Sequence, residues 1–301
     1  MGISYEKMYE IHYYECDKNL NCTLESIMNF LGDVGNKHAE SLNVGMDYLT
    51  ERNITWVFYK YNIKVNRYPE YEEKIRVKTV AEEFKKFYAL RSYEIYDEKN
   101  IKIVEGSALF LLIDIVKRRA IKITDDQYKA YNVDKNSTTK KLIGSLERLE
   151  KVKNKEYVSN FKVRYSDIDF NKHVNNVKYV QWFMDSVPQE IREEYELKEI
   201  DILFEHECYY NDEIKCVCEI HKNQDNLLVL RFKIKTVKNW LFSSQNGNKK
   251  TLGYGSEFFI NATLWLCIQQ LCVLSSMPIE DWIHHSHHER LKVLRQNKDQ
   301  G

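Results

Sequence analysis

The chain has 301 residues, of which 43% are hydrophobic, 13% aromatic and 30% charged, and this composition excludes a disordered protein. Its length suits two domains, and equal numbers of basic and acidic residues (45 each) argue against a nucleic-acid-binding protein. Seven cysteines without disulfide-scaffold spacing, and an N-terminus without an apolar signal segment, predict a protein of the reducing cytosol.

The first half opens with one strand and one amphipathic helix. Residues 5–14 are rich in Tyr and Ile, and residues 24–44 carry apolar residues at helical spacing: Leu24, Ile27, Leu31 and Val34. Runs of β-branched and aromatic residues then predict strands at 55–65, 74–80, 87–96 and 103–114. Residues 134–155 are charged, without apolar periodicity, and predict a linker.

The pattern of the first half recurs after the linker. Tyr13, Asp17 and Asn19 return as Tyr165, Asp169 and Asn171, 152 residues later in each case. The helical stripe returns as Val177, Val180, Met184 and Val187, and residues 71–77 resemble 210–216. An internal duplication explains these repeats most simply, the alternative being chance similarity between two α+β domains. The second copy differs from the first in having His173 where the first has Asn21.

A polar cluster precedes the second predicted helix. Asp169, Asn171 and His173 alternate along the chain, so an extended backbone would direct all three side chains to one side. Asn175 or Asn176 would cap the helix, and Pro188 would end it. The helix N-terminus would favour negative charge developing on a carbonyl oxygen under attack, so the three side chains form a candidate hydrolytic set. The alternative is a run of turn and capping residues without chemistry.

The segment YSDIDFNKHVNNVKY at 165–179 resembles the signature of the acyl-acyl-carrier-protein thioesterases of plants and bacteria, and KHAESL at 37–42 resembles their first-domain helix. The similarity extends from about Tyr5 to about Lys235. It implies an α+β tandem (double) hot-dog fold, in which each half is an antiparallel sheet wrapped round a long helix.

The resemblance also implies site residues. The family's catalytic Asp, Asn and His fall on Asp169, Asn171 and His173, and its downstream Glu-Cys pair falls on Glu207 and Cys208. Strand alternation alone cannot choose between Glu205 and Glu207, whereas the resemblance chooses Glu207.

Glu207 is expected to lie buried against an acyl tunnel. Glu207 and His173 would activate water, or Glu207 would attack directly, while Asn171 orients a partner and Asp169 positions Asn171 or polarises the site.

Other reactive residues have simpler interpretations. Cys208 could act as a nucleophile with His173, but a regular strand would point it away from Glu207, so we expect a core cysteine. Cys216 and Cys218 are expected to pack, and the histidines at 284–288 to lie on a surface helix or tail, so no metal is expected. The basic groups at 85–86 and 117–119 could contact an acidic carrier protein, or be solvated.

The resemblance weakens after Thr236, where the family would add one more strand. Residues 258–277 contain no charged residue and are long enough to span a bilayer, but their Asn, Gln and Ser residues favour a buried or surface-packed helix over a membrane anchor. A tail that replaces the native last strand is the third alternative, and the sequence does not separate it from the others.

The sequence thus predicts an N-terminal domain (1–133), a linker (134–155), a C-terminal catalytic domain (156–236) and a divergent tail (237–301). The first domain would line the acyl pocket. We expect hydrolysis of fatty acyl-ACP to free fatty acid and ACP, ending fatty acid synthesis, without a cofactor. The expected partner is acyl carrier protein, with no nucleic acid or membrane, and a homodimer remains open. The alternatives are an acyl-CoA thioesterase or a non-catalytic acyl-carrier-binding protein.

Overall fold

The computed structural model describes residues 2–136, 149, 152–153, 157–170, 172–204, 207–222, 227–237, 239–241, 252–254 and 259–268. Residues 1–267 form one compact unit. Most of the expected linker, residues 269–301 and the histidines at 284–288 lie outside the described residues. Within those residues, no helix is long and apolar enough to cross a membrane.

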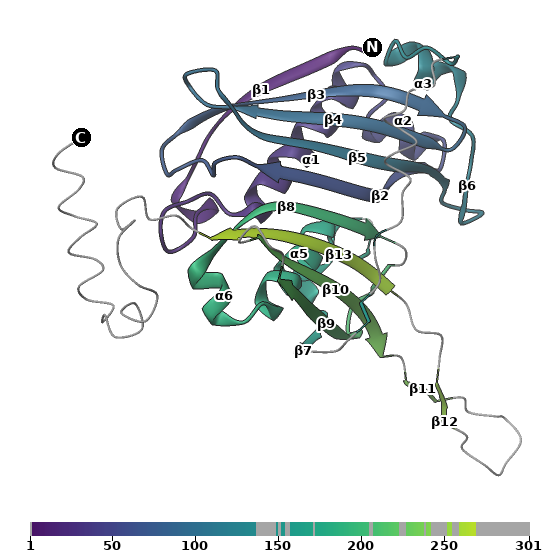
Figure 1. The fold of residues 1–301 in the computed structure, drawn as a ribbon. Coiled ribbons are helices and arrows are strands. Elements are labelled where there is room, and N and C mark those ends of the chain that lie inside the picture. Colours follow the sequence, from purple (N-terminus) through teal and green to yellow (C-terminus); the bar gives the residue numbers. More distant parts are fainter. Residues whose placement is uncertain are drawn as a thin grey trace, which may run out of the picture. The chain divides into compact units, whose positions relative to one another are not determined.

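The first half consists of a long helix and an antiparallel sheet (Figure 1). Its elements are β1 (Ser4–Glu10), a 3-10 turn η1 (Tyr13–Glu15), α1 (Leu24–Ser41), α2 (Met46–Glu51), β2 (Ile54–Val65), β3 (Lys74–Lys85), β4 (Tyr88–Tyr96), β5 (Lys102–Asp114), β6 (Arg119–Ala120) and α3 (Asp125–Ala130). The helix and the strands predicted between residues 5 and 114 are therefore confirmed, with β3 five residues longer than predicted.

Helix α1 forms where predicted because its N-terminus is capped and one face is apolar. The Thr23 hydroxyl accepts a hydrogen bond from the Ser26 backbone N–H at 3.2 Å. Ile27, Leu31 and Val34 are fully buried against the sheet. Each such side chain contributes about 1.5–3 kcal/mol of apolar burial, so packing rather than intrinsic propensity holds this helix.

The second half repeats this order. It contains β7 (Tyr157–Lys162), a 3-10 turn η2 (Tyr165–Asp167), α5 (Asn176–Ser186), α6 (Gln189–Glu194), β8 (Tyr195–Phe204), β9 (Glu213–Lys222), β10 (Leu227–Val237) and β13 (Phe259–Ile268), and a separate two-stranded ribbon, β11 (Asn239–Leu241) with β12 (Leu252–Tyr254). Asn175 caps α5, as expected, and the helix ends before Pro188.

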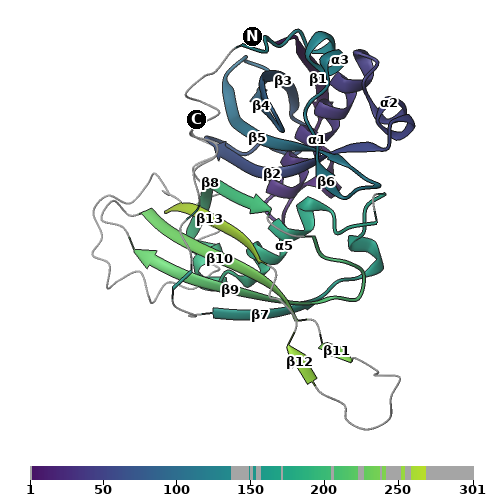
Figure 2. The same cartoon turned by 90° about the vertical axis from the view of Figure 1, so that its right-hand side faces the viewer.

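The two halves share one continuous sheet, in the order β1-β3-β4-β5-β2-β8-β13-β10-β9-β7, with β6 beside β5. Strands β2 and β8 pair antiparallel across the junction. Helices α1 and α5 contact each other on the same side of this sheet (Figures 1 and 2), and one hydrophobic core includes residues from both. The expected tandem hot-dog fold is confirmed.

The structure corrects the interpretation of residues 258–277. Residues 259–268 form strand β13, which pairs antiparallel with β10 and lies between β10 and β8. The predicted helix is therefore wrong for these residues, and the second half of the sheet continues beyond residue 236. An uncharged apolar run fits a buried strand as well as a buried helix, because hydrophobicity without periodicity does not distinguish them.

The duplication is visible in two equivalent loops. Each loop closes by a backbone hydrogen bond of 2.8 Å, from Asp17 N–H to Asn21 O in the first half and from Asp169 N–H to His173 O in the second. Leu20 and Lys172, also 152 residues apart, both have left-handed backbone conformations. The loops lead into α1 and α5 respectively, so each half carries the same scaffold with different side chains.

Candidate active site

The loop that carries His173 is a tight turn rather than the extended segment expected from the alternation. Ile168 and Val174 form an isolated antiparallel bridge, and between them Lys172 N–H bonds to Asp169 O at 3.0 Å. The Asp169 carboxylate accepts a bond from the His173 backbone N–H at 3.3 Å. Asp169 therefore acts first on the loop backbone, as a turn residue does. Asn171 lies outside the described residues.

A buried carboxylate fixes the base of this loop. Asp167 is fully buried and accepts hydrogen bonds from the Arg164 backbone N–H at 2.8 Å and from Arg164 Nε and Nη2 at 3.2 and 3.0 Å. Its backbone oxygen accepts from Asn175 N–H at 2.9 Å. Burial by itself would raise the pKa of Asp167, but the bonds from Arg164 outweigh it and lower that pKa.

His173 meets Glu207 at the end of this loop. Their Nε2 and Oε2 atoms are 3.2 Å apart. The Glu207 side chain is 42% exposed and the His173 side chain 32%, so the expectation of a buried Glu207 is wrong. An imidazole and a carboxylate within hydrogen-bond distance can act together as a general base.

The backbone beside Glu207 is held by both the loop and helix α5. Cys208 O accepts from Val174 N–H at 3.1 Å, and Cys208 N–H donates to Tyr179 Oη at 3.1 Å. Burial raises the pKa of Tyr179 well above its usual value, so its hydroxyl stays neutral. Cys208 is itself buried, which agrees with a core cysteine. Cys208 was expected to point away from Glu207 on a regular strand. Instead, β8 ends at Phe204 and Cys208 lies in a loop.

Two residues that sequence reasoning did not assign to the site complete the polar cluster. Tyr209 Oη donates to Glu207 Oε2 at 3.2 Å, and its ring packs edge-on against the His173 ring. Arg118 Nη2, from the first half, lies 3.1 Å from Tyr209 Oη and 3.9 Å from Glu207 Oε2. The Glu207 carboxylate therefore faces an imidazole, a phenol and a guanidinium.

The N-terminus of α5 faces the same site. Asn175 Oδ1 accepts from Val177 N–H at 3.1 Å, and Lys178 N–H bonds to Asn175 O at 2.9 Å. The Asn176 backbone N–H bonds to none of the residues that the structure describes. As the first residue of an eleven-residue helix, it provides a donor at the positive end of the helix dipole. This donor can stabilise an oxyanion.

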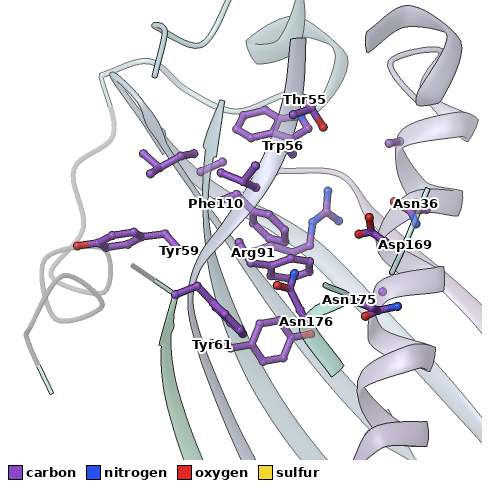
Figure 3. A pocket seen from close by; sticks show the side chains of 18 of the residues that line it. Asn36, Thr55, Trp56, Tyr59, Tyr61, Arg91, Phe110, Asp169, Asn175 and Asn176 are labelled. Atoms are coloured by element: carbon purple, nitrogen blue, oxygen red, sulfur yellow. The ribbon is translucent and has the colours of Figure 1, made fainter. Parts of the chain in front are cut away.

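A cavity of about 1050 Å³ extends from this cluster into the first half. Figure 3 shows Trp56, Tyr61 and Phe110 from the sheet on one side, and Asn36 of α1 on the other. Residues at the candidate site that also line it are Arg118, Asp169, Phe170, His173, Asn175, Asn176, Tyr179, Glu207 and Tyr209. The first half thus supplies most of the cavity wall, and the second half supplies most of the polar cluster.

Two other predicted candidates, Cys216 and Cys218, lie apart from this cluster. Glu205 lies outside the described residues, whereas Cys216 and Cys218 are buried in β9. Burial raises the pKa of the Cys216 thiol to about 12, which suits a packing role. Within the described ranges, no group of three or more His, Cys, Asp or Glu residues could hold a metal.

Fold and site together define a tandem hot-dog protein with one polar cluster at the mouth of a cavity. The solved structures that share this fold include an oleoyl thioesterase (putative) from Lactobacillus plantarum (TM-score 0.76, 19% identity, 89% of this chain and 98% of that one). They also include a 12:0-ACP thioesterase from Umbellularia californica (TM-score 0.70, 20% identity, 87% and 93%). These likenesses show the fold.

Sequence comparison identifies the family. Residues 2–131 match the acyl-ACP thioesterase N-terminal domain, and residues 150–250 match the acyl-ACP thioesterase C-terminal domain. The chain belongs to the acyl-ACP thioesterase family. The C-terminal match continues past Lys235, where the resemblance was expected to end.

Curated plant relatives agree with this family but are longer. The oleoyl-acyl carrier protein thioesterase of Coriandrum sativum is 25% identical over 238 residues, covering 74% of this chain and 64% of that protein. A Cuphea viscosissima acyl-[acyl-carrier-protein] hydrolase is 28% identical over 237 residues, covering 74% and 57%. The chain spans less than two thirds of the length of these relatives.

Proposed function

We propose that this protein hydrolyses fatty acyl thioesters of acyl carrier protein, releasing a free fatty acid and the carrier thiol. The observation that carries the proposal is the His173–Glu207 pair, 3.2 Å apart at the mouth of the cavity. The cavity wall includes Met28, Leu49 and Phe58 besides the aromatic residues already described. Such a wall suits an acyl chain, because apolar surface removed from water stabilises binding.

In the proposed reaction, Glu207 and His173 take a proton from a water molecule. The water oxygen attacks the thioester carbonyl carbon, and negative charge develops on the carbonyl oxygen near the Asn176 N–H. The carbon–sulfur bond then breaks, and the proton passes to the leaving thiolate. Asp169 supports the reaction by holding the loop of His173. Asn171, a catalytic residue by the family resemblance, keeps the orienting role hypothesised for it from the sequence.

Direct attack by Glu207 is the alternative route, and it would form an acyl anhydride on the enzyme. Single turnover in ¹⁸O-labelled water detects the direct route when the anhydride is hydrolysed at its Glu207 carbonyl. Water attack places the label in the fatty acid, whereas attack by Glu207 followed by hydrolysis of the anhydride at its Glu207 carbonyl places the label in that residue. We expect label in the acid and none in a peptide containing Glu207.

The proposal is tested by measuring thiol release from a long-chain acyl-ACP, with the wild type beside His173→Ala. We expect turnover by the wild type and its loss in the variant, with free fatty acid detected by mass spectrometry. Equal rates would remove His173 from the reaction. Binding of acyl-ACP without acid release would instead identify a non-catalytic carrier-binding protein.

The carrier is the second part of the proposal. ACP is favoured by the family to which the chain belongs, whereas acyl-CoA offers the same acyl and pantetheine groups. Side-by-side kcat/KM values for one acyl chain on both carriers decide between them, and we expect the ACP thioester to be the better substrate.

Location and assembly remain proposals as well. Within the part of the chain that the structure describes, Cys16, Cys22 and Cys216 form no disulfide bond, which supports a reducing compartment such as the cytosol. Strands β1 and β7 end the order of the sheet and are the edges at which a homodimer could pair. Light scattering on the purified protein tests the dimer.

A further inference from the structure

Arg118 reaches the polar cluster from a tight turn of the first half. The turn joins β5 to β6, and Asp114 Oδ1 accepts the backbone N–H groups of Val116 and Lys117 at 3.0 and 2.8 Å. Arg118 follows with φ of 49°, a left-handed conformation that is uncommon for a residue with a side chain. The turn is thus held by its own hydrogen bonds, and it presents Arg118 at the cavity mouth.

The donor and the acceptor can be assigned in the hydrogen bonds that join Arg118, Tyr209 and Glu207. A guanidinium has only donors, so the Arg118–Tyr209 contact of 3.1 Å requires the tyrosine oxygen to accept. The single Tyr209 hydroxyl proton is then left for Glu207 Oε2, 3.2 Å away. Without Arg118, the same hydroxyl could rotate and accept from water or from a neighbouring donor.

We infer that Arg118 is a positioning residue, by which the first half orients the Tyr209 hydroxyl and the Glu207 carboxylate for the chemistry of the second half. This inference rests on the proposed hydrolysis. Arg118 acts through Tyr209, and its positive charge lies 3.9 Å from Glu207 Oε2. The hydrogen bond with Tyr209 and then the charge of Glu207 raise the pKa of Arg118, so the guanidinium stays charged.

A second role for the same side chain would be to contact an acidic carrier protein, because its side chain is 72% exposed and Lys117 and Arg119 adjoin it. Carrier contact and positioning of Glu207 predict different kinetic effects of replacing Arg118. Contact with a carrier affects KM for acyl-ACP only, whereas positioning of Glu207 affects kcat on every thioester. A small thioester such as acyl-N-acetylcysteamine has no carrier surface and separates them.

The experiment compares wild type, Arg118→Gln, Tyr209→Phe and the double variant on acyl-ACP and on acyl-N-acetylcysteamine. We expect Arg118→Gln to lower kcat about tenfold on both substrates, because about 1.4 kcal/mol of transition-state positioning corresponds to that factor. The double variant should be no slower than the slower single variant, since both substitutions break the same chain of hydrogen bonds.

Lys117→Gln is the matched control. Lys117 lies in the same turn and pairs with Asp114 Oδ2 at 3.5 Å, so its substitution should leave kcat on the small thioester unchanged. Thermal melts of all variants exclude unfolding. The inference is overturned if Arg118→Gln changes only KM for acyl-ACP. It is also overturned if the double variant loses kcat by the product of the two single fold-changes, because independent substitutions combine in that way. If the wild type itself releases no thiol, the proposed function fails, and the inference with it.

Discussion

Asp167 holds the base of the loop that carries His173. Its carboxylate binds the backbone and side chain of Arg164, and its backbone oxygen holds Asn175, the cap of α5. These bonds join residues within eight positions of Asp167 in the sequence, so local contacts hold the loop. The Asp167 carboxylate therefore helps to position the candidate active site, although it takes no part in the proposed chemistry.

Replacing Asp167 with Asn should lower the free energy of unfolding at pH 7 by about 1–3 kcal/mol, because buried hydrogen bonds to a charged group are lost. The pKa of Asp167 is lowered in the folded state, so its stabilisation is complete above the unfolded value of about 3.9 and is lost as pH falls through the folded value. Melting temperatures from pH 7 to pH 3 should show the gap between wild type and variant closing. A gap that widens towards pH 3 would contradict this sign.

At the scale of the element, α1 combines a buried face with an open one. Ile27, Leu31 and Val34 pack into the core, while Gly32 and Gly35 line the cavity. A methyl group added at Gly32 would meet no atom within 4 Å, whereas one added at Gly35 would lie 3.3 Å from Tyr93 Oη. Glycine at position 32 thus weakens the helix but leaves room in the cavity.

Gly32→Ala should therefore raise stability by up to about 1 kcal/mol, the difference in helix propensity, with little change in kcat. Gly35→Ala is the matched control, and we expect a smaller gain because of the close approach to Tyr93. Chemical denaturation of both variants measures the difference. Equal gains at the two positions would contradict the packing described for this face of α1.

A larger side chain at the same position tests whether the cavity holds the acyl chain. Gly32→Met should reduce kcat/KM for a sixteen-carbon substrate by about tenfold, the scale at which apolar pockets discriminate substrates. An eight-carbon substrate should be affected less, because a shorter chain needs less of the cavity. Equal reductions for the two chain lengths would place the acyl chain elsewhere.

At the scale of the whole molecule, the halves meet where β2 pairs with β8. Asn62 Nδ2 donates to Glu199 Oε1 at 2.9 Å and to Asp201 Oδ1 at 3.0 Å across this junction. Burial, only partly offset by the bond from Asn62, raises the pKa of Asp201. The junction thus contains a carboxylate whose ionised form the fold disfavours.

Asp201→Asn should consequently match or exceed the wild type in melting temperature at pH 7. Because the folded pKa of Asp201 is above its unfolded value, the wild type gains stability as pH falls through the folded value towards the unfolded one. The advantage of the variant should therefore shrink between pH 7 and pH 4. An advantage that grows on acidification would show that the ionised carboxylate stabilises the junction.

The sequence predicted the architecture well because its signals are periodic. Apolar stripes at helical spacing predict α1 and α5, and β-branched runs predict β2 to β5. The repeat of the residues around Asp17 at Asp169 predicts the duplication. Two local patterns misled. The alternation from Asp169 to His173 fits a strand but is a turn, and the apolar run of β13 fits a helix equally well. In both cases, tertiary pairing decided between conformations that the local sequence allows.

The site was only partly predictable for a related reason. His173 was predicted from the polar cluster before the second helix and Glu207 from the family resemblance, whereas Arg118 and Tyr209 meet them only through folding. Arg118 and Tyr209 are 91 residues apart and belong to different halves, and no sequence period brings them together. The exposure of Glu207 likewise follows from β8 ending at Phe204, which the residues around it did not signal.

The most direct test of the account is kcat for thiol release from acyl-ACP by Glu207→Gln, measured beside Glu190→Gln. Glu190 is an exposed residue of α6 and controls for the loss of a surface carboxylate. We predict that Glu207→Gln keeps the wild-type melting temperature and loses at least about a hundredfold in kcat, as removal of a general base does, while Glu190→Gln retains full activity. A folded Glu207→Gln variant with wild-type kcat would contradict the assignment of the chemistry to the His173–Glu207 pair.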